Sequence, residues 1–308
     1  MNEKILRFLE TRVDLLKQKD KDQDASRRTY SEVFDDSTLM LLYKLIGDGI
    51  IDTLEFPIST GKEANVFRGT KGDRHVAVKI FRVSNATFKN FGMYIEGDPR
   101  FKKTGKDHRG LISIWAQKEF KNLQRMREAG IRVPEPLAVK GNVLVMEYIG
   151  KDAEAAPMLR DANLGAKALA QVASDLIDKL DRAYNRAGLV HGDLSEYNIL
   201  ILGKESVLID VGQAVVLEHP MSKELFVRDL QNIAAYFKRM NLDFDWKSIH
   251  DKIISHKKVT PLKRNMGLER RHMQEKEEDD RLDREEKERM SIQIAGAGVK
   301  GSGGPEEE

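Results

Sequence analysis

Asp193, Asn198 and Asp210 form a set of polar residues whose spacing suits phosphoryl transfer. Asp193 and Asn198 lie five residues apart in the segment H-G-D-L-S-E-Y-N, and Asp210 ends the second of two apolar runs that follow. The Asp193 carboxylate can take a proton from a hydroxyl, while the Asn198 amide oxygen and the Asp210 carboxylate can hold Mg²⁺ on ATP phosphates. For either aspartate alone, capping of a turn is the competing interpretation. We therefore predict a base at Asp193 and metal ligands at Asn198 and Asp210.

Strands are expected to hold these ligands and a second set of residues upstream. Short apolar runs bounded by glycine and charged residues predict strands at 199–202 and 208–209, and an antiparallel sheet from 54 to 83. Alternation in the segment V-A-V-K-I places Lys79 on the same face as Ala77 and Phe81. A lysine on an apolar face needs a partner, which the α- and β-phosphates of a nucleotide would supply. The alternative is a surface lysine that snorkels from an edge strand.

Glu119 is the expected protein partner of Lys79. It shares the apolar stripe of a predicted helix, 111–129, where an unpaired carboxylate would be unfavourable. An ion pair between Lys79 and Glu119 would satisfy both groups and orient the lysine on ATP. A Glu119 exposed beside Lys118 is the alternative.

Two further segments are candidates for nucleotide binding. The predicted turn S-T-G-K-E-A could bring backbone amides, Ser59 and Lys62 to phosphate, although a single glycine in a hairpin usually marks only a turn. The segment M-E-Y-I-G ends a predicted strand. There the backbone of Glu147 and Ile149 could bind an adenine edge, with Met146 packing against the ring.

Composition narrows the class of protein. The chain has 308 residues, 33% charged residues with a net charge of +2, and no cysteine. The balanced charge does not suggest a chain built mainly to coat nucleic acid. The missing cysteines exclude disulfides, thiolate zinc sites and cysteine nucleophiles. No stretch approaches the roughly 18 apolar residues of a membrane span, and no signal peptide is evident, so we expect a cytoplasmic protein without a membrane partner.

Six motifs in order resemble the RIO family of atypical serine/threonine protein kinases. They run from about residue 30 to about residue 254: S-T-G-K-E-A-N-V-F, V-A-V-K, G-D-P-R-F, W-A-Q-K-E-F, H-G-D-L-S-E-Y-N and I-D-V-G-Q-A-V. The first motif is similar to the type-one branch, in a compact, archaeal-like form. The N-terminal region looks too short and too interrupted for the winged helix that precedes the kinase domain in the type-two branch.

The resemblance implies an α+β, two-lobed protein-kinase-like fold, with a small antiparallel-sheet N-lobe and a reduced helical C-lobe. We expect an N-terminal helical extension at 1–52, an N-lobe at 53–148 with a flexible loop at 84–110, a C-lobe at 149–262 and a tail at 263–308 that is charged and helical, then disordered.

The resemblance also implies function. ATP and Mg²⁺ or Mn²⁺ would be the cofactors, the enzyme would phosphorylate itself on serine, and a pre-small-subunit ribosomal particle, protein and rRNA, would be its partner during maturation. By matching position, Asp193 is the base, Asn198 and Asp210 bind metal, and Asp210 has a second catalytic role as acceptor of a transient aspartyl-phosphate. Lys79, Glu119, Glu147 and Ile149 take the nucleotide-binding roles given above. Ser113 is a candidate acceptor serine.

Departures from ordinary protein kinases shape this expectation. The chain lacks a G-x-G-x-x-G loop and an A-P-E motif, and Ser195 stands where those kinases place a lysine. Only about fifty residues separate Gly212 from the charged tail, too few for the helices that grip peptides in ordinary protein kinases. We therefore expect controlled ATP turnover on a large assembly rather than broad activity on free peptides.

Two other classes stay open at this level. Small-molecule kinases of the aminoglycoside and choline type share the H-G-D motif with a later asparagine, but usually have a larger second lobe. A non-catalytic scaffold would instead bind rRNA through basic residues in loops and in the tail. Those residues are Lys102, Lys103, Arg109, Lys257, Lys258, Arg270 and Arg271.

Overall fold

The computed structural model describes residues 3–13, 34–83, 88–101, 108–151 and 154–256. The expected tail and all of the basic scaffold residues except Arg109 lie outside these ranges. Arg109 is described, and its guanidinium is 2.6 Å from the carboxylate of Asp35. In the described ranges, no helix is long and apolar enough to cross a membrane.

A five-stranded antiparallel sheet carries Lys79 on its middle strand. The strand order is β1-β2-β3-β5-β4. Lys79 on β3 lies opposite Val66 of β2 on one side and Leu144 of β5 on the other. The five strands are β1 (Thr53–Thr60), β2 (Ala64–Lys71), β3 (Arg74–Phe81), β4 (Pro136–Lys140) and β5 (Val143–Glu147).

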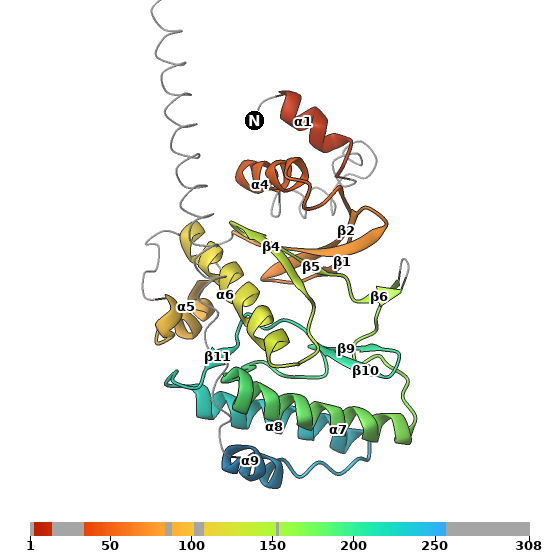
Figure 1. The fold of residues 1–308 in the computed structure, drawn as a ribbon, viewed down its shortest axis with the longest axis vertical. Coiled ribbons are helices and arrows are strands. Elements are labelled where there is room, and N and C mark those ends of the chain that lie inside the picture. Colours follow the sequence, from red (N-terminus) through yellow and green to blue (C-terminus); the bar gives the residue numbers. More distant parts are fainter. Residues whose placement is uncertain (1–2, 14–33, 84–87, 102–107, 152–153, 257–308) are drawn as a thin grey trace, which may run out of the picture. The chain divides into compact units, whose positions relative to one another are not determined.

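Different helices cover the two faces of this sheet (Figure 1). Val76 and Val78 of β3 share one hydrophobic core with α1 (Glu3–Glu10) and α4 (Asp36–Gly47). Ala77 and its neighbours on the opposite face share a second core with α6 (His108–Glu128). Successive strand residues point to opposite faces, so β3 contributes to both cores. The described helices of the expected N-terminal extension, α1 and α4, therefore pack on the sheet.

The segment expected to be a flexible loop, 84–110, contains regular structure. It forms α5 (Phe88–Ile95) and a short 3-10 turn, η2 (Pro99–Phe101). The Phe91 ring stacks on Trp115 of α6, with centroids 4.0 Å apart, and Tyr94 meets the same indole edge-on. The prediction is thus corrected for residues 88–101. The Lys, Arg, Gly and Asp residues of the whole segment 84–110 concealed the apolar residues of α5, and tertiary structure supplies Trp115 as the partner of Phe91 and Tyr94.

The second lobe is mainly helical, and short strand pairs line its side nearest the sheet (Figure 1). The helix α9 packs against α7 and α8. The α+β, two-lobed architecture expected from the sequence is confirmed. The helical elements are α7 (Ala166–Arg182), the π-helical turn η3 (Ala183–Ala187), α8 (Ser222–Arg239) and α9 (Trp246–Ser255). The strand pairs are β6 (Gly150–Lys151) with β7 (Glu154–Ala155), β8 (Leu189–Val190) with β11 (Val215–Val216), and β9 (Ile199–Leu202) with β10 (Glu205–Leu208).

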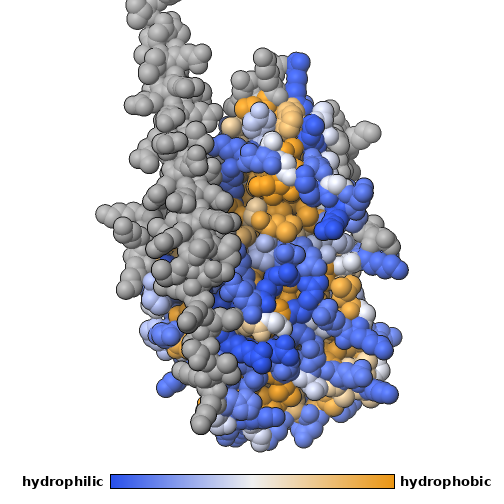
Figure 2. All heavy atoms as spheres, viewed as in Figure 1, coloured by the Kyte–Doolittle hydropathy of each residue, from blue (hydrophilic) through white to orange (hydrophobic). Residues whose placement is uncertain are grey.

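Figure 2 shows hydrophilic residues over much of the described surface on this face, with hydrophobic areas between them. The large apolar side chains that are most exposed come from separate elements, so we treat them as single surface residues rather than as one docking face. They are Phe56, Met93, Leu137, Tyr197, Met240 and Ile254.

Candidate active site

The hairpin of β9 and β10 brings Asn198 and Asp210 together. Ile199 at the start of β9 pairs with Leu208 at the end of β10. The chain positions just outside this pair, Asn198 and Ile209, are joined by a 3.0 Å hydrogen bond from the Ile209 amide to the Asn198 carbonyl. Asp210 is the next residue. Two ligands that are twelve positions apart in sequence are therefore neighbours because a short antiparallel hairpin closes on itself.

Asp193 lies beside this pair. The Asn198 amide nitrogen donates to the Asp193 carbonyl at 2.8 Å and to its carboxylate at 3.3 Å. Gln213, which the sequence analysis did not select, donates to the same carboxylate oxygen at 3.2 Å. Burial and the nearby charge of Asp210 raise the pKa of Asp193. A raised pKa strengthens a carboxylate as a base, which suits proton removal from a hydroxyl.

Lys79 joins the two lobes at this point. Its ammonium donates to the two carboxylate oxygens of Glu119 at 2.9 and 2.8 Å, and to Oδ1 of Asp210 at 2.9 Å. The lysine is buried on the middle strand of the sheet, so the alternative of a snorkelling lysine on an edge strand is wrong. Burial alone would lower the pKa of Lys79, but the carboxylates of Asp210 and Glu119 outweigh it and raise that pKa.

Glu119 acts through Lys79. Its side chain is 1% exposed and lies on the buried face of α6, as the helical periodicity indicated, so the alternative of a rim-exposed glutamate is also wrong. Complete burial raises the pKa of Glu119 to about 7, against the pull of the Lys79 ammonium. The Lys79 ammonium therefore favours the ionised form of a carboxylate that burial disfavours.

Asp210 has the features of a ligand that reaches toward bound phosphate. Its backbone φ is 56°, in the left-handed region that aspartate adopts more readily than most residues, and 49% of its side chain is exposed. Its withdrawal from water opposes ionisation, but the charge and hydrogen bond of Lys79 prevail and lower the pKa of Asp210. The carboxylate is therefore ionised and accessible at neutral pH.

The donor set fits a magnesium ion that arrives with a nucleotide. Within the described residues, no group of three or more His, Cys, Asp or Glu side chains could hold a metal by itself. Mg²⁺ commonly binds through one or two protein ligands together with substrate phosphates and water. Asn198 and Asp210 would supply those protein ligands, and the bound ion would neutralise charge on the phosphates.

The expected phosphate-binding turn carries a partly buried acidic residue beside the two residues selected from the sequence. Ser59, near the end of β1, and Lys62, in the turn before β2, are exposed, and among the described residues neither side chain has a hydrogen bond or ion pair with Lys79, Asp193 or Asp210. Glu63, the next residue, is half-buried, and its pKa is raised by burial and then by the charge of Asp210. The charge of this carboxylate therefore interacts with that of Asp210. The roles of Ser59 and Lys62 stay predictions.

The residues expected to bind adenine lie where the sheet passes into the second lobe. Met146 is buried in β5, next to Ala77 of β3. The Glu147 side chain is held by Arg132 at 2.7 and 2.6 Å, so only its backbone could meet an adenine edge. Ile149 lies beyond the end of β5, outside the ladder of the sheet, and its side chain packs with Ala156 and Val207. Adenine binding at these positions stays a prediction.

Asp229 is a site residue that the sequence analysis missed. It is fully buried on α8 and accepts hydrogen bonds at 2.8 Å from the amides of Gly192 and Leu194, the two neighbours of Asp193. Burial raises the pKa of Asp229 to about 7. The signal was present in the sequence: Asp229 falls on the apolar stripe of its helix, as Glu119 does on α6.

Ser113, the candidate acceptor, lies on α6 and is half-buried. No hydrogen bond among the described residues links its side chain to Asp193.

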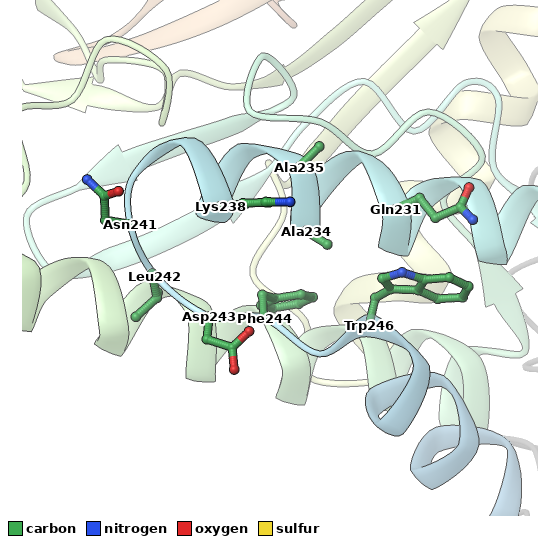
Figure 3. Close-up of a pocket in the computed structure, with 9 residues that line it drawn as sticks. All are labelled: Gln231, Ala234, Ala235, Lys238, Asn241, Leu242, Asp243, Phe244 and Trp246. Atoms are coloured by element: carbon green, nitrogen blue, oxygen red, sulfur yellow. The ribbon is translucent and has the colours of Figure 1, made fainter.

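A separate cavity of about 540 Å³ lies between α8 and the segment that leads to α9, lined by Lys238, Phe244 and Trp246 among others (Figure 3). None of the candidate site residues lines it. The reactive groups of this chain instead converge between the sheet and the β9–β10 hairpin.

Comparisons with known proteins agree with this geometry. The family model for the RIO domain matches residues 65–249. The RIO-type serine/threonine-protein kinase Rio1 of Haloferax volcanii is 44% identical over 247 residues, which cover 77% of this chain and 84% of that protein. Rio1 of Methanocaldococcus jannaschii is 39% identical over 236 residues, with 76% and 80% covered. The crystal structure of the Rio2 kinase-ADP/Mg²⁺-phosphoaspartate complex from Chaetomium thermophilum has a TM-score of 0.57 at 18% identity, covering 84% of this chain and 88% of that one, which shows a shared fold.

Proposed function

Because this chain belongs to the RIO family and is a RIO-type serine/threonine kinase, we propose that it transfers the γ-phosphoryl group of Mg-ATP through Lys79, Asp193, Asn198 and Asp210. The family rules out the alternative of a small-molecule kinase. Transfer to a serine of its own chain and turnover of ATP to ADP and phosphate are both part of the proposal.

One contact carries this proposal: the Lys79 ammonium lies between Glu119 and Asp210, 2.8 Å from the first and 2.9 Å from the second. A phosphotransferase needs a fixed cation for the nucleotide phosphates and a carboxylate for the metal at the same point. Glu119 orients the lysine from one lobe, and Asp210 presents the metal ligand from the other.

The remaining residues divide the work of the reaction. Asp193 accepts the proton of the attacking hydroxyl, and Asn198 and Gln213 hold its carboxylate in place. A bound Mg²⁺ would neutralise charge on the transferring phosphate, with Asn198 and Asp210 as its protein ligands. The backbone of Glu147 and Ile149 and the side chain of Met146 would hold adenine. Ser59 and Lys62 would act only if their turn closes on the nucleotide.

Asp210 is also our candidate for a covalent phosphate acceptor. One carboxylate oxygen would attack the γ-phosphorus as the bond to the ADP oxygen breaks, and water would later release inorganic phosphate and restore the carboxylate. The Rio2 structure that shares this fold is a complex with ADP, Mg²⁺ and phosphoaspartate. In this chain Oδ1 of Asp210 is bound to Lys79 and the side chain is half exposed, which supports attack by Oδ2.

A role in maturation of the small ribosomal subunit is the proposed biological setting. Its support is family membership together with the reduced second lobe. In residues 211–256, the structure describes α8 and α9 as the only helices, which leaves little surface for gripping a peptide. A large particle would then supply the contacts that orient a substrate.

The proposal is tested with purified protein, Mg²⁺ and γ-labelled ATP, following label into free phosphate, phosphoserine and hydroxylamine-sensitive acyl phosphate. We expect turnover by the wild type and its loss in Asp193→Ala and Asp210→Ala. Hydroxylamine-sensitive label that is absent only from Asp210→Ala would support the aspartyl-phosphate. A wild-type protein that binds ATP but neither hydrolyses nor transfers it, even with pre-ribosomal particles, would contradict the proposal and favour the scaffold.

A further inference from the structure

The buried face of α6 carries two polar residues that the mechanism above does not use. Lys118 and Asn122 are both fully buried, one helical turn apart, beside the Glu119 already described. Buried polar side chains are unfavourable unless they are hydrogen-bonded, so their partners indicate what they do.

Both residues hold the backbone that follows Asp210. The Lys118 side-chain nitrogen donates to the Gly212 carbonyl at 2.8 Å and to the Ala214 carbonyl at 2.6 Å. The Asn122 amide nitrogen donates to the Val211 carbonyl at 2.8 Å and to the Ala214 carbonyl at 3.0 Å. One helix thus makes four hydrogen bonds to three carbonyls within 211–214.

Arg100 determines which way the Asn122 amide points. Its guanidinium donates to the Asn122 side-chain oxygen at 2.8 Å, and a guanidinium has donors only, so that oxygen must face it. The Asn122 nitrogen is consequently turned toward the carbonyls. Arg100 is itself held by the buried carboxylate of Asp98, at 2.9 Å from its Nε and 2.7 Å from a terminal nitrogen.

These contacts help to fix the backbone conformation of Asp210. A non-glycine residue at φ 56° is strained and persists only where its surroundings fix it. Upstream, the Ile209 amide is bound to Asn198 and the Ile209 carbonyl accepts from the His191 ring. Downstream, the carbonyls held by Lys118 and Asn122 complete the restraint. Asp210 is therefore fixed from both sides.

We propose that Arg100, gripped by Asp98, is a positioning residue for phosphoryl transfer, which acts through Asn122 to hold residues 211–214 and thereby to aim Asp210 at the metal. The inference rests on the proposed function. It gives η2 a mechanical role: Arg100 of η2 holds Asn122, which binds the carbonyl of Val211, the residue after Asp210. The ion pair of Arg100 with Asp98 also suits the fixing of one local conformation better than a gain in stability, since buried ion pairs contribute little net stability.

The test compares Arg100→Lys with Arg68→Lys. Lysine keeps a positive charge beside Asp98 but lacks the planar fork that reaches two partners at once. Arg68 is the matched control: its side chain is also 11% exposed and is ion-paired with one carboxylate, Glu55, but among the described residues it has no hydrogen bond or ion pair with Asp98, Asn122 or Asp210. Asp98→Asn is a second variant, which weakens the contact with Arg100 while keeping a side chain of nearly the same size at position 98. Calorimetry measures the Kd of ADP with and without Mg²⁺, and kcat is measured alongside.

In Arg100→Lys we expect the Kd of metal-free ADP to stay within about twofold of the wild-type value. The factor by which Mg²⁺ tightens ADP binding should fall roughly tenfold, and kcat should fall about tenfold or more. Asp98→Asn should show a smaller loss of the same kind, and Arg68→Lys none. If Mg²⁺ tightens ADP binding in Arg100→Lys and in Asp98→Asn as much as in the wild type, this inference is overturned and the proposed function is not. An equal loss of metal-free ADP binding would also overturn the inference, because it would mark a general structural role. If the wild type shows no tightening by Mg²⁺, the proposed metal site fails as well.

Discussion

The ammonium nitrogen of Lys79 lies 2.9 Å from Oδ1 of Asp210, although the two residues are 131 positions apart. The same nitrogen contacts both carboxylate oxygens of Glu119. One cation thus joins the sheet, the helix α6 and the β9–β10 hairpin. Without it, one fully buried carboxylate and one metal ligand lose their common partner.

Replacing Lys79 should separate stability from activity. In Lys79→Met, Glu119 is left buried without a counter-ion, so we expect a loss of roughly 3 kcal/mol in the free energy of unfolding at pH 8. ATP turnover should fall at least about a hundredfold. The double variant Lys79→Met/Glu119→Met should recover most of the stability and none of the activity, because no buried charge remains. Denaturant unfolding and turnover of labelled ATP measure the two effects. Full turnover by the single variant would refute the assignment of Lys79.

The acid limb of the pH–rate profile should report Asp193. A base works only when ionised, so kcat must fall as pH falls through the pKa of Asp193, which burial and Asp210 raise. The charge of Arg228 opposes that rise. Arg228→Gln should therefore move the acid limb of kcat to higher pH, whereas Lys223→Gln, an exposed lysine on the same helix, should leave it in place. An acid limb that Arg228→Gln leaves unmoved would remove Asp193 as the titrating group.

Lys118 should make stability depend on pH in the alkaline range. Burial, then the charge of Arg100, lowers the pKa of Lys118 from 10.5 to about 7. Between those values the unfolded chain binds a proton that the folded chain does not, so the free energy of unfolding rises with pH across this window. Relative to Lys118→Met, wild-type stability should increase by a few kcal/mol between pH 7 and pH 10.

Urea unfolding of both proteins at several pH values measures this difference. Parallel curves would mean that Lys118 keeps its proton in the folded state and donates to Gly212 and Ala214 as a full ammonium.

Gly192 should resist substitution more strongly than another glycine of similar conformation. Its φ is +80°, and an added Cβ would lie 2.7 Å from the Gln213 carbonyl oxygen. Gly203 has φ +64° with open space around the same position. Gly203→Ala should therefore lose only the 1–2 kcal/mol of left-handed strain, and Gly192→Ala about 1–3 kcal/mol more.

Activity should separate these two variants as well, since Gly192 precedes Asp193 and Gly203 lies in the turn between β9 and β10. We expect kcat to fall in Gly192→Ala and to stay near wild type in Gly203→Ala. Equal behaviour of the two variants would show that the contact with Gln213 relaxes freely.

The local sequence pattern was sufficient to predict the strands and the helix that carry the site. The strands around Lys79 and the apolar runs after Asn198 follow periods of two or short hydrophobic runs, which sequence displays directly. Glu119 was found because a carboxylate on a helical apolar stripe demands a partner. Asp229 carries the same signal on α8, but its partners are backbone amides, which no side-chain pattern in the sequence displays.

The sequence by itself determined the fold class, the family and the residue types available for chemistry, because these depend on short-range spacing and on motif order. Tertiary structure decided that Asp229 binds the amides on both sides of Asp193, and that Phe91 and Tyr94 pack against Trp115. It also decided that Arg100 reaches Asn122, which in turn holds Val211, 89 positions further along the chain. Such contacts leave no periodic trace, since each depends on where the folded backbone places a carbonyl or a ring.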